Sequence, residues 1–175
     1  MKKTPLQAHR DTNLRLIIIA MLISFRMSAA TWTDFGSYDI SWFDNSKSEF
    51  VISTPQQLAG VAYLINNNFT SFSNKTLYLS ADIDLNGKLW TPIGTSSTTF
   101  QGNLDGQGHS IKSITVKDCY YYKSGFWLNL SDAKVSNVSF DIHVSKLTDP
   151  IVIGSIAASA SSVEFNNIKV KNYID

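Results

Sequence analysis

Three carboxylates in one part of the chain are the residues best suited to chemistry: Asp82, Asp84 and Asp105. Carboxylate oxygens are hard ligands that suit Ca²⁺, and carboxylates gathered in one groove can act as acid and base on a polysaccharide. However, Asp82 and Asp84 alternate outward on one expected strand. Asp105 stands in a glycine turn, where aspartate commonly bonds to nearby backbone. We therefore expect no catalytic residue, metal site or cofactor, and keep a polysaccharide lyase or hydrolase as the alternative.

Two further residues have reactive side chains but lack a suitable setting. His109 follows Gly106 and Gly108 and could work with Asp105 as an acid–base pair, but we expect its ring to bond within the turn. Cys119 is the only cysteine, which excludes an intrachain disulfide, and no histidine is near it in the sequence. We expect structural roles for both.

A run of three tyrosines with a tryptophan nearby is the better candidate for binding. Successive strand residues point to opposite faces, so at least one tyrosine should be exposed. Exposed rings on a flat β-surface stack on sugars or pack against a partner protein. The alternative is a loop whose rings fold back on the core. The candidate ligand-binding residues are Tyr120, Tyr121, Tyr122 and Trp127.

Composition indicates one all-β domain. The chain has 175 residues, 12% of them aromatic and only 17% charged. That length can bury a sizeable core without disulfides. The net charge of +1 predicts no general attraction to nucleic acid.

The first 30 residues have the pattern of a secretory signal peptide. Four basic residues precede a short apolar run over 16–25, and small residues lead to an expected cut after Ala30. An uncleaved membrane anchor is the alternative, but Arg26 ends the run before it reaches the ~20 residues needed to span a bilayer. We expect an exported protein, at the cell surface or extracellular, with a single domain over 31–175.

One helix is expected in that domain, near 55–66. Thr54 can serve as its N-cap, Pro55 suits its first position, and Gln57 can complete a capping box by reaching back to the cap backbone. Apolar residues then recur at helical spacing. We expect this helix to cap the N-terminal end of the β-structure. The stretch 76–85 that follows alternates apolar and polar residues throughout, which predicts a strand.

Glycines divide the next stretch, 90–116, into short strands. We assign corner and turn roles to Gly102, Gly106 and Gly108, and expect a bend near Lys112. Short strands joined by such sharp turns indicate a sandwich, a barrel or a solenoid.

A six-residue pattern decides among these folds. Apolar, polar, small polar, apolar, polar and apolar residues recur from Ile111, Val135 and Phe165, at separations of 24 and 30 residues. Such periods are typical of solenoids, in which each coil covers the apolar face of its neighbour. The third positions of the pattern are expected to stack as a side-chain ladder of Ser113, Asn137 and Asn167.

The order of motifs also resembles a known family. The blocks DIDL, W-x-PIG and F-x-G-x-x-DG-x-GH-x-I, followed by SGFWLNL and VSNVSF, are similar to bacterial surface proteins with the GLUG motif, including repeat regions of IgA-protease-type peptidases. The resemblance covers about 32–170. It implies a right-handed parallel β-helix. With the residue arguments above, we expect a surface or secreted adhesin-like binding module without catalysis, whose partner is a host or matrix glycan or protein.

The last strand pattern ends close to residue 175, with no second cap in the sequence. Repeat arrays usually need capped ends. We therefore expect self-association through the uncapped C-terminal coil, or a chain that is the N-terminal fragment of a longer solenoid and is truncated at its C-terminal end.

Overall fold

The computed structural model describes residues 31–32, 36–116, 123–144, 152–153 and 156–174. Its parallel strands form a β-solenoid of about four turns, which confirms the predicted fold class. The strands are β1 (Glu49–Ile52), β2 (Thr76–Leu79), β3 (Ile83–Asp84), β4 (Asn103–Asp105), β5 (Ser110–Val116), β6 (Lys123–Ser124), β7 (Trp127–Ser131), β8 (Lys134–Val144), β9 (Val152–Ile153), β10 (Ala157–Ser161) and β11 (Glu164–Ile174).

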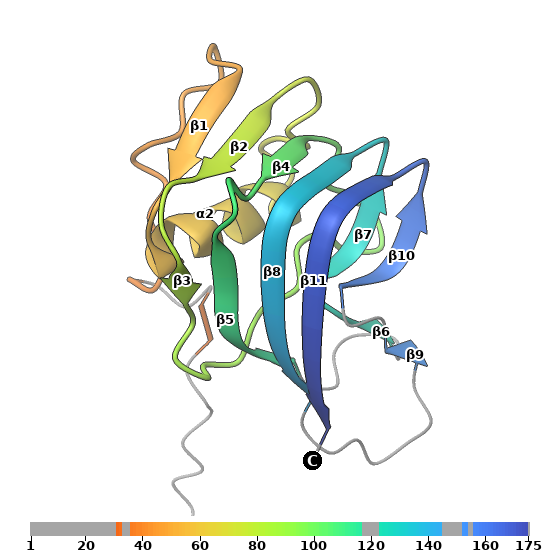
Figure 1. The fold of residues 1–175 in the computed structure, drawn as a ribbon. Coiled ribbons are helices and arrows are strands. Elements are labelled where there is room, and N and C mark those ends of the chain that lie inside the picture. The colour runs from red at the N-terminus through yellow and green to blue at the C-terminus, as the bar shows by residue number, and fades with distance from the viewer. Residues whose placement is uncertain (1–30, 33–35, 117–122, 145–151, 154–155, 175) are drawn as a thin grey trace, which may run out of the picture.

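The largest sheet forms the bent wall at the front of the solenoid (Figure 1). Its strand order is β1-β2-β4-β8-β5-β3, and β11 pairs with β8. Strand β8 is long enough to pair with β4 through its first half and with β5 through its second half. A second wall consists of β7 and β10, and β6 pairs with β9. All these pairs are parallel, as stacking of successive coils requires.

The core is a stack of inward side chains in register from coil to coil. Leu77 pairs with Leu104 and Leu104 with Val135, and the three are at most 2% exposed. Aromatic rings fill the wider part of the interior. The Trp90 ring stacks on Phe126 with centroids 5.0 Å apart, and its Nε1 donates to the Phe126 carbonyl at 3.0 Å. The bond offsets the cost of burying a polar N–H.

Helix α2 (Pro55–Asn66) begins and ends within the predicted range. Thr54 Oγ1 accepts from the Gln57 backbone N–H at 3.2 Å, as expected for an N-cap. The Gln57 side chain accepts from the Ser53 N–H at 2.8 Å, so it reaches one residue beyond the cap residue that we predicted. In the chain the helix follows β1 and precedes β2, which pair directly with each other, and its apolar face is buried. That it caps the stack stays a prediction.

The register of the repeats differs from the predicted one at the first pattern. Val135 pairs with Phe165, as expected, but Ile111 pairs with Phe140 rather than lying level with Val135. The stretch from Ile111 therefore follows the second half of β8, and Ser113 occupies a register shift in β5 near the predicted bend.

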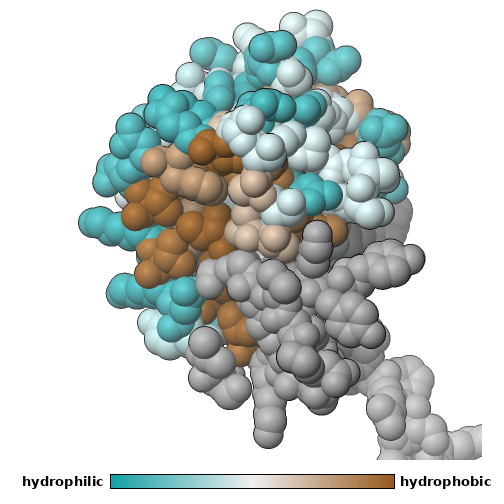
Figure 2. All heavy atoms as spheres, turned by 90° about the vertical axis from the view of Figure 1, so that its right-hand side faces the viewer, coloured by the Kyte–Doolittle hydropathy of each residue, from teal (hydrophilic) through white to brown (hydrophobic). Residues whose placement is uncertain are grey.

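The end of the stack that carries β10 and β11 is apolar at its centre. Figure 2 faces this end and shows hydrophobic side chains gathered there. Phe165 and Val170 of β11 are 43% and 37% exposed, whereas their partners on β8, Val135 and Phe140, are at most 1% exposed. One coil deeper in the stack, the same positions are fully covered.

Among the described residues, no helix is long and apolar enough to cross a membrane. The predicted signal peptide, 1–30, lies outside the described residues.

Candidate functional site: a polar groove across β5, β8 and β11

Trp127, one of the predicted ligand-binding aromatic residues, is buried in the core. Trp127 is only 1% exposed, and its ring contacts Phe126 and Phe140, with centroids 4.6 and 5.7 Å away. It belongs to the core and offers no ring to a surface ligand. The prediction went wrong because alternation along a strand does not tell which residues face inward when Gly125 and Phe126 are buried too. Tyr120, Tyr121, Tyr122 and Cys119 lie outside the described residues.

Asp105 is bonded within the corner between β4 and β5. Its Oδ1 accepts from the Gln107 backbone N–H at 3.0 Å and from Asn137 Nδ2 at 3.1 Å. Asn167 Nδ2 in turn donates to Asn137 Oδ1 at 3.0 Å. The coils are therefore linked by a ladder of Asp105, Asn137 and Asn167, and Asp105 takes the place that we had predicted for Ser113.

The glycines of this region serve close packing and turning. A Cβ at Gly102 would lie 2.7 Å from the Phe72 carbonyl oxygen, so no side chain fits there. Gly108 has φ +85°, a conformation that other residues rarely adopt, and the space around it is open. Between them, Gly106 packs directly against the next coil.

His109 lies beside Asp82 of the preceding coil, and not beside Asp105 as the acid–base alternative would require. Its Nδ1 is 3.5 Å from Asp82 Oδ1, while Lys112 Nζ is 2.6 Å from Asp82 Oδ2. The Lys112 hydrogen bond, with a further one from the Ser110 N–H, holds the pKa of Asp82 well below its usual range. The same bond raises the pKa of Lys112, so this lysine stays protonated and cannot serve as a base.

Replacing Asp82 with asparagine tests this ion pair. Because the pair is solvent-exposed, we expect the free energy of unfolding to fall by less than ~1 kcal/mol at pH 7. A lowered folded-state pKa stabilises the protein above the ordinary carboxyl pKa, and this contribution is lost as the pH falls toward the folded-state value. The difference between wild type and Asp82→Asn, measured by urea unfolding, should therefore narrow below about pH 4.

The control for that measurement is Asp132→Asn, at an exposed carboxylate that forms no ion pair with a described residue. This variant removes a surface carboxylate without breaking an ion pair between described residues, and its free energy of unfolding is measured at the same pH values. If the difference in free energy of unfolding between wild type and Asp82→Asn stayed constant between pH 7 and pH 2, the stabilising ion pair of Asp82 would be contradicted.

A polar groove of about 400 Å³ crosses the outer face of the bent wall. Side chains on a strand that are two residues apart lie about 7 Å apart, so neighbouring rows of outward side chains leave a channel between them. One row follows the register from Ser110 to Ser139 to Lys169, and the next contains Lys112, Asp141 and Lys171. The groove is lined by Ser110, Lys112, Ser139, Phe140, Asp141, Lys169 and Lys171.

Only some of the charged side chains in this groove have an ion-pair partner. Lys112 is held by Asp82, whereas Lys169 and Lys171 form no ion pair with any described residue. Asp141 Oδ1 is buried and accepts no hydrogen bond within the described part of the chain; His143 Nε2 lies 3.6 Å away. The groove thus offers two exposed ammonium donors beside a half-buried carboxylate. Sequence reasoning missed it because its residues come from three strands far apart in the sequence.

An aromatic pair borders the same face. The Tyr173 ring stacks on His143, with centroids 4.5 Å apart and planes 8° apart, and Tyr173 is 44% exposed. These residues form the next pair in register along β8 and β11. A flat ring beside hydroxyl and charged groups is the combination that sugar rings favour.

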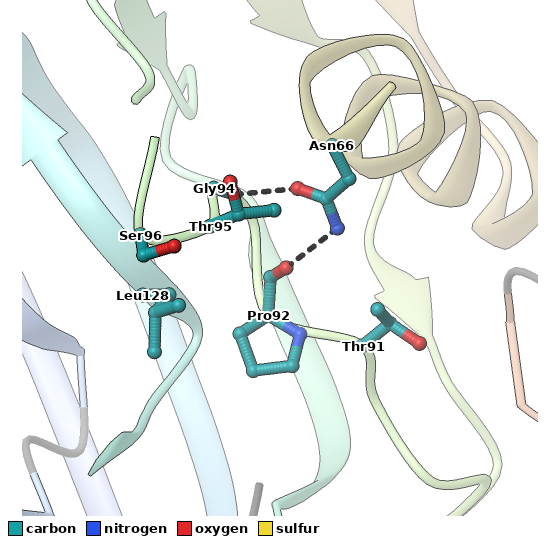
Figure 3. Close-up of a pocket in the computed structure, with 7 residues that line it drawn as sticks. All are labelled: Asn66, Thr91, Pro92, Gly94, Thr95, Ser96 and Leu128. Atoms are coloured by element: carbon teal, nitrogen blue, oxygen red, sulfur yellow. Dashed lines mark hydrogen bonds between the residues drawn. The ribbon is translucent and has the colours of Figure 1, made fainter. Parts of the chain in front are cut away.

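A second pocket, of about 330 Å³, lies beside the C-terminal end of α2 (Figure 3). The side chain of Asn66 bridges the loop that forms one side of it: Oδ1 accepts from the Gly94 N–H at 2.7 Å and Nδ2 donates to the Pro92 carbonyl at 3.0 Å. Both amide groups are thus used in joining the helix to the next coil. The pocket is lined by Asn66, Thr91, Pro92, Gly94, Thr95, Ser96 and Leu128.

No group of three or more histidine, cysteine, aspartate or glutamate side chains within the described residues is arranged to hold a metal ion. Comparison with protein-family models, with curated proteins and with solved structures gave no match.

Proposed function

We propose that the protein is an exported, non-catalytic, adhesin-like binding module of the GLUG type that takes an acidic glycan in the groove across β5, β8 and β11. The observation that carries this proposal is the pair of exposed ammonium groups, Lys169 and Lys171, without an ion-pair partner among the described residues. Host or matrix polysaccharides with carboxylate groups are the class of ligand that these groups suit.

The side chains that line the groove offer the hydrogen-bonding groups that a saccharide needs. Hydroxyl groups of Ser110 and Ser139 can donate to and accept from sugar hydroxyls, and the Asp141 carboxylate is an acceptor. Lysine ammonium groups make charge-assisted hydrogen bonds with a carboxylate. The volume lies in the lower part of the range found for small-ligand sites, ~300–1,000 Å³. We expect a short stretch of sugar to bind, with one carboxylate near Lys169.

Two features of the groove argue for binding rather than catalysis. A lyase needs a neutral base, and Lys112 does not suit that role because its hydrogen bond with Asp82 raises its pKa. A glycoside hydrolase uses two carboxylates ~5–9.5 Å apart, and Asp141 is the one carboxylate among the described residues that line the groove. The enzyme stays the alternative function, and cleavage of the probe below would favour it.

A matched pair of probes tests the proposal: trigalacturonate and its fully methyl-esterified form, titrated by calorimetry. We expect the acid to bind and the neutral ester to bind at least tenfold more weakly, since a hydrogen bond to a charged group contributes ~1.5–3 kcal/mol. Affinity for the acid should fall with increasing salt. Mass spectrometry should recover the probe intact.

Lys169→Gln removes the ammonium without shortening the side chain much, and should weaken binding of the acid by about tenfold or more. Lys47→Gln, at an exposed lysine outside the groove, removes the same charge and should leave binding unchanged. Equal binding of acid and ester, or equal effects of the two variants, would overturn the groove as the site.

A further inference from the structure

The outer edge of β11 is a long unpaired strand edge. Strand β11 pairs with β8 along Glu164–Ile174, and the described residues provide no strand on its other side. Its backbone groups on that side are a template for another strand. The neighbouring inward side chains form the apolar end seen in Figure 2. The charged residues of β11 and of the strands beside it indicate which kind of strand would fit this edge.

Charges alternate from coil to coil in register with β11. Lys134 of β8 and Glu164 of β11 form an ion pair with Lys134 Nζ 3.0 Å from Glu164 Oε1. Two further pairs in register also join an acid to a base: Asp84 of β3 with Lys112 of β5, and Asp141 of β8 with Lys171 of β11. Opposite charges on facing strands stabilise a pair, and like charges destabilise it. The next strand in this series therefore requires a basic residue facing Glu164 and an acidic residue facing Lys171.

We propose that the free edge of β11 takes an extended, parallel strand from a partner protein, with a basic residue opposite Glu164, an acidic residue opposite Lys171 and apolar residues over Phe165, Ile168 and Val170. Addition of a strand to an exposed edge is a common mode of peptide recognition, in which the backbone supplies affinity and alternate side chains supply specificity. The bend of β11 at Asn167, with φ 52°, selects a strand that can bend at the same position.

A strand identical to β11 that adds to this edge in parallel fits it less well. In parallel, in-register pairing it would place glutamate against Glu164 and lysine against Lys171, and both contacts repel. The self-association expected from the sequence stays a prediction, and the charges of β11 favour a complementary strand over an identical one. This inference does not rest on glycan binding, although the two sites have Lys171 in common.

The test uses the full chain and a fluorescently labelled peptide with the sequence of 134–144. This peptide has a lysine, an asparagine and an aspartate at the required spacings, because β8 already pairs with β11 in that way. We expect saturable binding by fluorescence anisotropy. A charge-swapped peptide, Lys134→Glu with Asp141→Lys, should bind about tenfold more weakly. A peptide of 164–174 should bind more weakly than 134–144.

Protein variants place the peptide on β11. Val170→Asp should abolish binding, since it puts a charge in the apolar row, and its position is already 37% exposed, so the fold should persist. Val51→Asp, at a 58% exposed position on β1, should bind normally. Lys171→Glu should reduce the preference for the original peptide over the charge-swapped one. Equal binding of both peptides, or tighter binding of 164–174, would overturn the proposal, as would self-association in sedimentation velocity without peptide binding.

Discussion

Replacing Gly106 with alanine is expected to destabilise the protein by about 3 kcal/mol or more. A Cβ at this position would lie 2.4 Å from the Cβ of Val138 and 2.5 Å from the Asn137 carbonyl oxygen. Both atoms belong to the next coil and cannot rotate away. The corner between β4 and β5 would have to separate from β8, which would also weaken the hydrogen bond from the Gly106 N–H to the Ser136 carbonyl. Urea unfolding followed by tryptophan fluorescence measures the loss.

Gly108→Ala is the matched control two residues away. The backbone there has φ +85°, but nothing lies within 4 Å of the added Cβ. The cost should therefore be that of the left-handed conformation alone, ~1–2 kcal/mol. If Gly108→Ala proved as damaging as Gly106→Ala, conformation rather than packing between coils would explain both positions.

Trp127→Ala is expected to lower the free energy of unfolding by about 3–5 kcal/mol, because it opens a large cavity in the aromatic core. The ring lies against Phe100, Phe126 and Phe140 and is 1% exposed. Its Nε1 is buried without a hydrogen-bond partner among the described residues. Trp127→Phe removes that unpaired N–H and keeps a ring, so it should cost much less than Trp127→Ala.

Phe165→Ala provides the comparison at the open end of the stack. Its side chain is 43% exposed, so we expect a loss of about 1 kcal/mol. Thermal unfolding of the three variants under the same conditions checks the order. A loss for Trp127→Ala no greater than for Phe165→Ala would mean that the ring is not part of a tightly packed core. Any test of ligand binding that alters Trp127 will instead report on folding.

Local elements could be predicted from the sequence with good accuracy. The helix at 55–66 has a cap, a proline and an apolar face, all within 13 residues that contact one another locally. Leu77, Leu79, Ile83 and Leu85 are buried as their alternation predicted, but the single strand predicted over 76–85 is divided into β2 and β3, with 80–82 outside both. These signals depend on backbone periodicity alone, so they survive in almost any tertiary context.

The alignment of the coils could not be predicted in the same way. Ser113 and Asn137 both have φ 53°, and each is surrounded by the same apolar pattern. One is an irregularity within β5 and the other is the bend of β8. The pattern therefore reports a local backbone conformation, and only the strands alongside decide where in the coil it occurs. The groove depends on this register, so sequence reasoning could not find it.

The ladder of Asp105, Asn137 and Asn167 has a direction. A carboxylate can only accept, so Asn137 must turn its Nδ2 toward Asp105 and its Oδ1 toward the following coil. Asn167 then donates to Asn137 and points its own Oδ1 away from the stack. Asp105 thus sets the orientation of the Asn137 side-chain amide, and through it that of Asn167. The last group of the ladder, Asn167 Oδ1, is therefore a hydrogen-bond acceptor. A further strand can extend the ladder only if it carries a hydrogen-bond donor at this bend.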